Sequence, residues 1–137
     1  MTIQITITDA GIAEVVNAQN TGTGPVTLTE IGFGSSQYAP VSSQTDMQGE
    51  FKRLAAGGAS AVDDDVIHVT ATDESTDTYE VYEVGVFTGS GTLFAIYSQI
   101  GSPIIDKAAS SFALLSIDVQ VAATLSGDIT VGDSGFN

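Results

Sequence analysis

Apolar residues are densest between Thr78 and Gln99 (TYEVYEVGVFTGSGTLFAIYSQ), where two runs of β-branched and aromatic residues flank Gly89-Ser90-Gly91. Glycines at both ends of so short a connection supply the positive φ angles that a hairpin turn needs. The pattern therefore predicts a β-hairpin. A surface hairpin would alternate apolar and polar residues, because successive side chains of a strand point to opposite faces. This hairpin is apolar on both faces, which predicts a central position with a cover on each side.

Alternation predicts two faces for each strand. In the first strand, one face carries Tyr82, Val84 and Val86, and the other carries Tyr79, Val81 and Phe87. In the second strand, one face carries Phe94 and Ile96, and the other carries Leu93, Ala95 and Tyr97. A chain of this length has limited material for covering two faces, so we expect another copy of the chain to cover one of them. The candidate interaction surface consists of Tyr79, Val81, Phe87, Leu93 and Tyr97, although alternation leaves open which face meets the neighbour.

The rest of the chain predicts further strands and one short helix. Alternating residues predict strands over Thr2–Thr8, Pro25–Phe33, Val66–Thr72 and Phe112–Ala123, and either a strand, which we favour, or a short helix over Met47–Leu54. Thr8 and Asp9 supply an N-cap and an acidic first turn for a helix over Ala10–Ala18, with Ile12, Val15 and Val16 on one side. Polar residues predict a loop over Ser35–Asp46, and Gly127–Asn137 is typical of the start of a linker.

At least six strands and one helix predict an α+β fold that is mainly β, a β-sandwich-like domain with one short N-terminal helix. We expect this domain to occupy residues 1–125. Residues 126–137 are expected to form a glycine-rich C-terminal extension or the start of a linker.

The net charge of the chain limits the classes of molecule that it can bind. The chain has 17 acidic and 3 basic residues and a formal net charge of −14. Phosphate backbones and anionic membrane surfaces would be repelled, because both are bound through Lys and Arg. We therefore expect no nucleic-acid partner and no membrane insertion. Cysteine is absent, which excludes disulfides and thiolate metal sites, and the N-terminus lacks the basic and long apolar regions of a signal peptide.

Two features could suggest catalysis. Gly132-Asp133-Ser134-Gly135 matches the tetrapeptide around a protease nucleophile, which needs a histidine held by a buried carboxylate. The one histidine of the sequence, His68, lies in a predicted strand, and we expect the three residues that follow Ser134 here to be too few for a substrate pocket. We interpret the match as coincidence and His68 as a strand histidine rather than a metal ligand. No catalytic residue is expected.

The acidic turns could bind calcium, which takes six to eight oxygen ligands. Asp63-Asp64-Asp65 and the group Asp73, Glu74 and Asp77 both lack the ligand spacing of a calcium loop and are predicted to lie at opposite ends of one strand. We interpret them as solvated turns and expect no metal and no cofactor. Glu83 lies among apolar neighbours, so we expect an ion pair with Lys52, Arg53 or Lys107, or else an exposed edge position.

Three segments in order carry a resemblance to a known family. ITITDAGIAEVVNAQNTGTGPVTLTEIGFGSSQY, IHVTATDESTDTYEVYEVGVFTGSGTLFAIYSQ and PIIDKAAS resemble the N-terminal domain of bacteriophage tail-collar fibre proteins, the tail fibres of contractile-tailed phages. The resemblance covers roughly Thr2 to Val121. It implies a structural virion protein: a virion-proximal, trimeric fibre domain that joins the fibre to the baseplate without catalysis, located in the phage tail after assembly in the host cytoplasm.

The family's shaft and receptor-binding tip lie beyond this domain, so the sequence is expected to represent the anchoring domain alone or a naturally short adapter. A second hypothesis is a host-adhesion module that binds carbohydrate, in which the acidic turns hold calcium and Tyr38, Tyr79, Tyr82 and Tyr97 offer their rings. A hydrolase built on Ser134 and His68 is the third and weakest.

Overall fold

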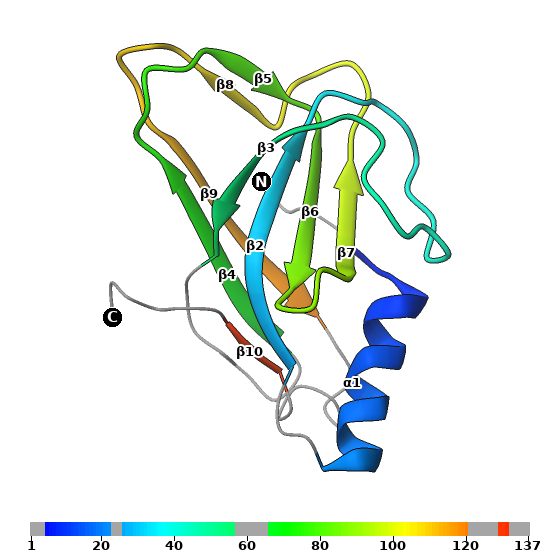
Figure 1. The fold of residues 1–137 in the computed structure, drawn as a ribbon. Helices are drawn as coiled ribbons and strands as arrows, with labels where there is room; N and C mark the ends of the chain where they lie inside the picture. The colour runs from blue at the N-terminus through cyan, green and yellow to red at the C-terminus, as the bar shows by residue number, and fades with distance from the viewer. Residues whose placement is uncertain (1–4, 23–25, 57–65, 121–128, 132–137) are drawn as a thin grey trace.

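A computed structural model describes residues 5–22, 26–56, 66–120 and 129–131 (Figure 1). The elements are β1 (Thr6–Ile7), α1 (Asp9–Thr21), β2 (Val26–Gly34), β3 (Glu50–Ala55), β4 (Val66–Asp73), β5 (Tyr79–Val81), β6 (Glu83–Thr88), β7 (Leu93–Ser98), β8 (Ile105–Lys107), β9 (Ala113–Gln120) and β10 (Ile129–Val131). The prediction of a mainly β fold with one N-terminal helix is confirmed.

One large sheet organises the described residues. Its strands follow the order β1-β7-β6-β2, and the far edge of β2 pairs with β3 over one part of its length and with β10 over another. The β2–β10 pairing is parallel, whereas the other pairings are antiparallel. Strands β4 and β9 form a separate two-stranded ribbon, and β5 pairs with β8. The predicted hairpin is thus β6–β7, at the centre of the sheet.

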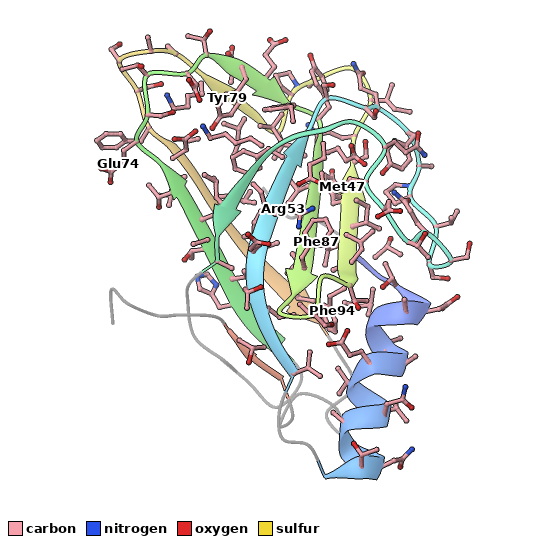
Figure 2. The ribbon with its side chains drawn as sticks, in the orientation of Figure 1. Met47, Arg53, Glu74, Tyr79, Phe87 and Phe94 are labelled. Carbon is pink, nitrogen blue, oxygen red and sulfur yellow. The ribbon has the colours of Figure 1, made fainter. Side chains whose placement is uncertain are left out.

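The first face of the large sheet is covered by residues 35–49, which we call the strap. The strap connects β2 to β3 and carries Met47, which packs on a cluster formed by Phe87, Leu93 and Ile96 (Figure 2). The thioether can approach this closely because two residues of the sheet beneath it are glycines. A Cβ atom on Gly32 or Gly85 would lie 2.7 or 2.8 Å from the Met47 sulfur. The cover that we expected from another copy therefore comes from the chain itself.

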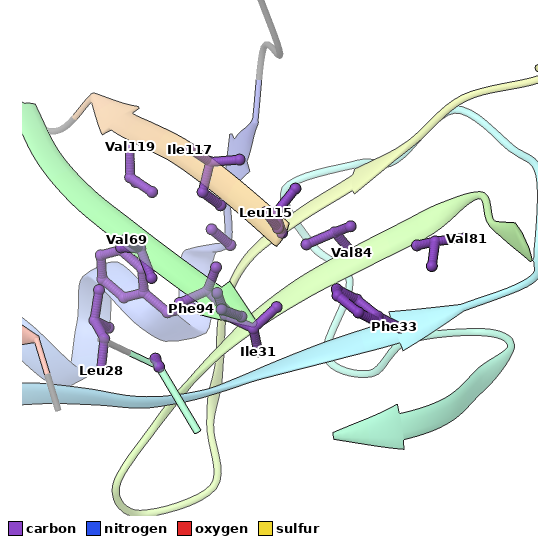
Figure 3. Close-up of a cluster of buried hydrophobic side chains, with 14 of the residues drawn as sticks. Leu28, Ile31, Phe33, Val69, Val81, Val84, Phe94, Leu115, Ile117 and Val119 are labelled. Atoms are coloured by element: carbon purple, nitrogen blue, oxygen red, sulfur yellow. The ribbon is translucent and has the colours of Figure 1, made fainter. Parts of the chain in front are cut away.

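The second face is covered by the β4–β9 ribbon, and the main core lies between the two (Figure 3). From the sheet come Leu28, Ile31, Phe33, Val84, Val86 and Phe94, and from the ribbon Val69, Ala71, Leu115, Ile117 and Val119. The ribbon residues alternate along their strands, as predicted for a strand with one buried face. Two β layers with a shared apolar interior account for the sandwich-like architecture.

The predicted division of the hairpin into two faces fails at two points. Strand pairing breaks at Tyr82, between β5 and β6, so that Val81 and Val84 belong to the same core cluster. The β6–β7 register also slips, because Phe87 pairs with Leu93 while Val86 pairs with Ala95. Such an extra residue places consecutive side chains on one side. Phe94 and Ala95 accordingly both join the main core.

Helix α1 begins at the predicted N-cap but is longer than predicted. The Thr8 hydroxyl accepts a hydrogen bond from the Gly11 N–H at 2.9 Å, and Gly22 ends the helix in the left-handed conformation at φ 68°. Gly11 packs so close to β7 that a Cβ atom would lie 2.8 Å from the Phe94 Cα. The helix thus docks through Gly11 and the buried Val15. The predicted apolar side was wrong in part, because Ile12 and Val16 are exposed.

Other predictions differ from the structure at the ends of the chain and near β8. Strand β8, at Ile105–Lys107, was not predicted from the sequence. Within the predicted extension over 126–137, Ile129–Val131 pairs with β2. The described part of the predicted Thr2–Thr8 strand is reduced to β1. No helix of the described residues is long and apolar enough to cross a membrane.

Candidate functional site

The five residues predicted to form an interaction surface do not lie together on the outside of the molecule. Val81, Phe87 and Leu93 are buried within the chain, and Tyr79 and Tyr97 are half-buried. Val81 belongs to the main core, whereas Phe87 and Leu93 lie under the strap. The prediction assumed unbroken alternation and no cover from the chain's own loop, and both assumptions were wrong.

The strap is attached to the sheet by the carboxylate of Glu83. This side chain is 0% exposed and accepts hydrogen bonds from the backbone N–H groups of Gln48 at 2.7 Å and Gly49 at 2.8 Å. It also accepts a hydrogen bond from the Tyr38 hydroxyl. The expected ion pair was wrong, because N–H and O–H donors of the strap satisfy this buried charge in place of a cation.

The surroundings of Glu83 show how closely the strap is fitted. A Cβ atom on Gly34 would lie 2.4 Å from the Glu83 Oε1, so only glycine leaves room for the carboxylate at that position. Gln44 supports the arrangement by donating to the Tyr38 hydroxyl at 2.5 Å. Burial raises the pKa of Tyr38 above its ordinary value, and the hydrogen bond to Glu83 raises it further. The phenol therefore remains a proton donor to the carboxylate throughout the neutral range.

Arg53 lies beside the strap on the same face of the sheet (Figure 2). Its guanidinium carbon lies 3.8 Å from the centroid of the Phe87 ring, and it pairs with Glu50 at 2.6 Å and Glu30 at 3.4 Å. Stacking a cation on the ring covers apolar surface while the charge stays partly hydrated. Arg53 is thus occupied within the chain.

The turn over residues 73–77 is built around two lysines. Lys52 pairs with Asp73 at 3.0 Å and with Asp77 at 2.6 Å. Lys107 is only 1% exposed and donates to the backbone carbonyls of Ser75, of Asp77 at 2.8 Å and of Ala108 at 3.2 Å. The ammonium group of Lys52 therefore bonds to the side chains of this turn, and that of Lys107 bonds to its backbone.

Asp73 is the buried carboxylate of this turn. It accepts hydrogen bonds from the Tyr79 hydroxyl at 2.6 Å and from the Ser75 backbone N–H at 2.9 Å. Burial by itself would raise the pKa of Asp73, but the hydrogen bonds from Tyr79, Ser75 and Lys52 together outweigh it and hold that pKa well below its usual range. For Tyr79, burial and the bond to Asp73 both raise the pKa. The carboxylate stays ionised and the phenol stays protonated.

These contacts bear on the calcium and catalytic hypotheses. Lys52 occupies the position between Asp73 and Asp77 that a cation would take, and the described residues contain no group of three or more metal-ligating side chains. His68 is half-buried on β4, across from Asp118. Asp63-Asp64-Asp65 and Ser134 lie outside the described residues.

Comparison with family models, with curated proteins and with solved structures finds no match for this chain. The resemblance to tail-collar fibre proteins therefore depends on the sequence segments themselves.

Substitution of Glu83 by glutamine should loosen the strap. The amide would replace one acceptor oxygen with an NH₂ group facing backbone donors, and we expect Glu83→Gln to lower the free energy of unfolding by about 2–3 kcal/mol. Urea denaturation measures the loss, and hydrogen exchange at Gln48 and Gly49 should accelerate. Glu80→Gln, an exposed position on β5, is the matched control. An unchanged urea midpoint in Glu83→Gln would contradict the assignment.

Asp73 should make stability depend on pH at the acid end. A carboxyl group whose pKa is lower in the folded than in the unfolded chain stabilises the fold above its unfolded pKa, about 4, and this stabilisation is lost as pH falls further. The stability difference between wild type and Asp73→Asn should therefore be largest near neutral pH and shrink below about pH 4. Urea midpoints over this range test it, with the exposed Glu74→Gln as the control for loss of one charge. A difference that is constant with pH would refute the prediction.

Proposed function

We propose that this chain is a structural virion protein, a virion-proximal tail-fibre domain that joins the fibre to the baseplate through protein–protein contacts and performs no catalysis. In this proposal it acts as a homotrimer, is assembled in the host cytoplasm and resides in the phage tail. The observation that carries the proposal is the order of the three segments that resemble tail-collar fibre proteins, over residues 5–38, 67–99 and 103–110.

Two features of the fold support this proposal. The three segments supply β1, β2, β6 and β7, which are neighbours in the large sheet, so the resemblance extends over the structural frame rather than over scattered loops. The buried charged groups Glu83, Asp73 and Lys107 each bond to the backbone of a loop of the same chain. Their charges therefore serve construction of the domain, as expected for an attachment module.

Immunoelectron microscopy of phage or tail-like particles from the source strain tests the proposal. Antibodies against the folded chain should label the junction between fibre and baseplate, because that is where a virion-proximal domain would lie. Particles from a strain in which the gene is deleted are the matched control and should lose both the label and the fibres. Tailed particles that carry no label in the unmodified strain would refute the proposal.

Carbohydrate binding is a second candidate, favoured by one open pocket of about 560 Å³. Its lining combines aromatic, hydroxyl and charged side chains: Phe51, Lys52, Thr76, Asp77, Thr78 and Tyr79. The Phe51 ring is 45% exposed and lies 5.3 Å from that of Tyr79, between centroids. Two aromatic rings beside a mostly polar lining suit the mixed surface of a sugar ring. Among the four tyrosines considered, Tyr79 lines this pocket, and the lysine contacts leave calcium without a role in it.

Removal of the Phe51 ring tests this second candidate. Glucose, galactose and N-acetylglucosamine at millimolar concentrations should each be titrated into labelled protein, and binding should shift the amide resonances of residues 76–79. Phe51→Ala should abolish the shifts, whereas Phe112→Ala, which removes an exposed phenylalanine outside the pocket, should preserve them. Absence of shifts with all three sugars in wild type would eliminate the candidate.

A further inference from the structure

Met47 attaches the strap to the large sheet through a thioether group. Its side chain is half-buried and packs on Phe87, Leu93 and Ile96, which are almost completely buried. Both neighbours of Met47 in the chain are exposed. The thioether therefore takes part in an apolar contact that lies directly beneath an exposed loop. A thioether in such a position combines access for small molecules with a structural role, because methionine fills irregular apolar gaps.

The sulfur atom of Met47 is closely packed on the sheet. It lies over Gly32 and Gly85, and the positions of a Cβ atom on these glycines are 2.7 and 2.8 Å from it. The Leu93 Cδ1 lies 2.9 Å from the same point over Gly85. The sulfur, the leucine and the backbone thus leave little space between them. A larger or more polar group in place of the thioether would strain this contact, because interiors packed to this density tolerate added atoms poorly.

Hydrogen-bond donors near Met47 already have acceptors. The backbone N–H groups of the next two residues donate to the carboxylate of Glu83. Arg53 lies on the same face of the sheet, with its guanidinium over the Phe87 ring, and each of its three guanidinium nitrogens donates to a carboxylate (Figure 2). A strong acceptor oxygen on the Met47 sulfur would therefore be better satisfied in water than beneath the strap.

We propose that Met47 is a site of oxidation by hydroperoxides, and that formation of its sulfoxide releases the strap from the sheet. A lone pair of the sulfur attacks the terminal oxygen of the hydroperoxide, so that an S–O bond forms while the O–O bond breaks. The proton of the transferred oxygen moves to the other oxygen, which leaves as water or as an alcohol. The sulfur loses two electrons and the peroxide gains them. The product is a polar side chain in place of an apolar one.

The release is local and exposes the first face of the β6–β7 hairpin. Without the thioether contact, the strap is held by hydrogen bonds, such as those of Glu83 and of the Ser98 hydroxyl, which donates to the Ser36 carbonyl at 2.8 Å. Water can replace these bonds at small net cost once it reaches them. The main core lies on the other face of the sheet, and the described residues that form it include no methionine. Oxidation thus opens the strap and leaves the two β layers packed.

Treatment of the folded chain with millimolar hydrogen peroxide tests the proposal. Peptide mapping by mass spectrometry should locate one added oxygen on Met47, and amide hydrogen exchange at Gln48 and Gly49 should become about tenfold faster or more. Exchange at Val119, in the main core, should not change. The matched control is Met47→Leu, which keeps an apolar side chain of similar size, and its strap should exchange equally fast before and after peroxide. Met1, the other methionine, is present in both proteins, so its oxidation does not affect the comparison.

The proposal is overturned if peroxide that fully oxidises free methionine leaves Met47 unmodified, or if the sulfoxide forms while exchange at Gln48 and Gly49 stays the same. Equal acceleration at Val119 also overturns it, because the whole fold would then have been lost. Methionine sulfoxide reductases for both epimers, with dithiothreitol as the reductant, should return exchange to the rates of untreated protein. Rates that stay raised after the oxygen has been removed would assign the change to damage elsewhere and refute the proposal.

Discussion

The β6–β7 hairpin is apolar on both faces, and the need to cover both faces organises the rest of the fold. The β4–β9 ribbon covers one face through a continuous apolar interior. The strap covers the other with a single large apolar side chain, Met47, and is otherwise attached by polar contacts. Because hydrogen bonds contribute little net stability unless they satisfy buried groups, the strap depends on the buried carboxylate of Glu83.

The charges of this acidic chain fall into two groups with different roles. Those in the first group bond to other parts of the same chain: Glu83 bonds to the strap, while Lys52 and Lys107 bond to the 73–77 turn. No buried side-chain nitrogen or oxygen of the described residues lacks a hydrogen-bond partner. The charges outside are mostly carboxylates, and their like charge disfavours close contact between copies of the chain.

Glycines make the close contacts of this fold possible. Gly11 brings α1 against the backbone of β7, and Gly34 leaves space for the Glu83 carboxylate. Nothing local in the sequence distinguishes a glycine that needs backbone freedom from one that needs space. The distinction appears only when the segment that packs on the glycine is known. The same holds for Gly32 and Gly85 beneath Met47.

The sequence by itself determined most of the longer strands, the N-cap of the helix and the apolar character of the hairpin, because these follow from local alternation and from residue-specific backbone preferences. It predicted that the hairpin is central and that the ribbon has one buried face. Tertiary structure decided the rest. The extra residue at Phe94 and the break at Tyr82 changed which side chains share a face, and a polar loop, rather than a second copy, covered the hairpin. Such outcomes depend on residues far apart in the chain, as the contact of Glu83 with Gln48 and Gly49 shows, and no local pattern encodes them.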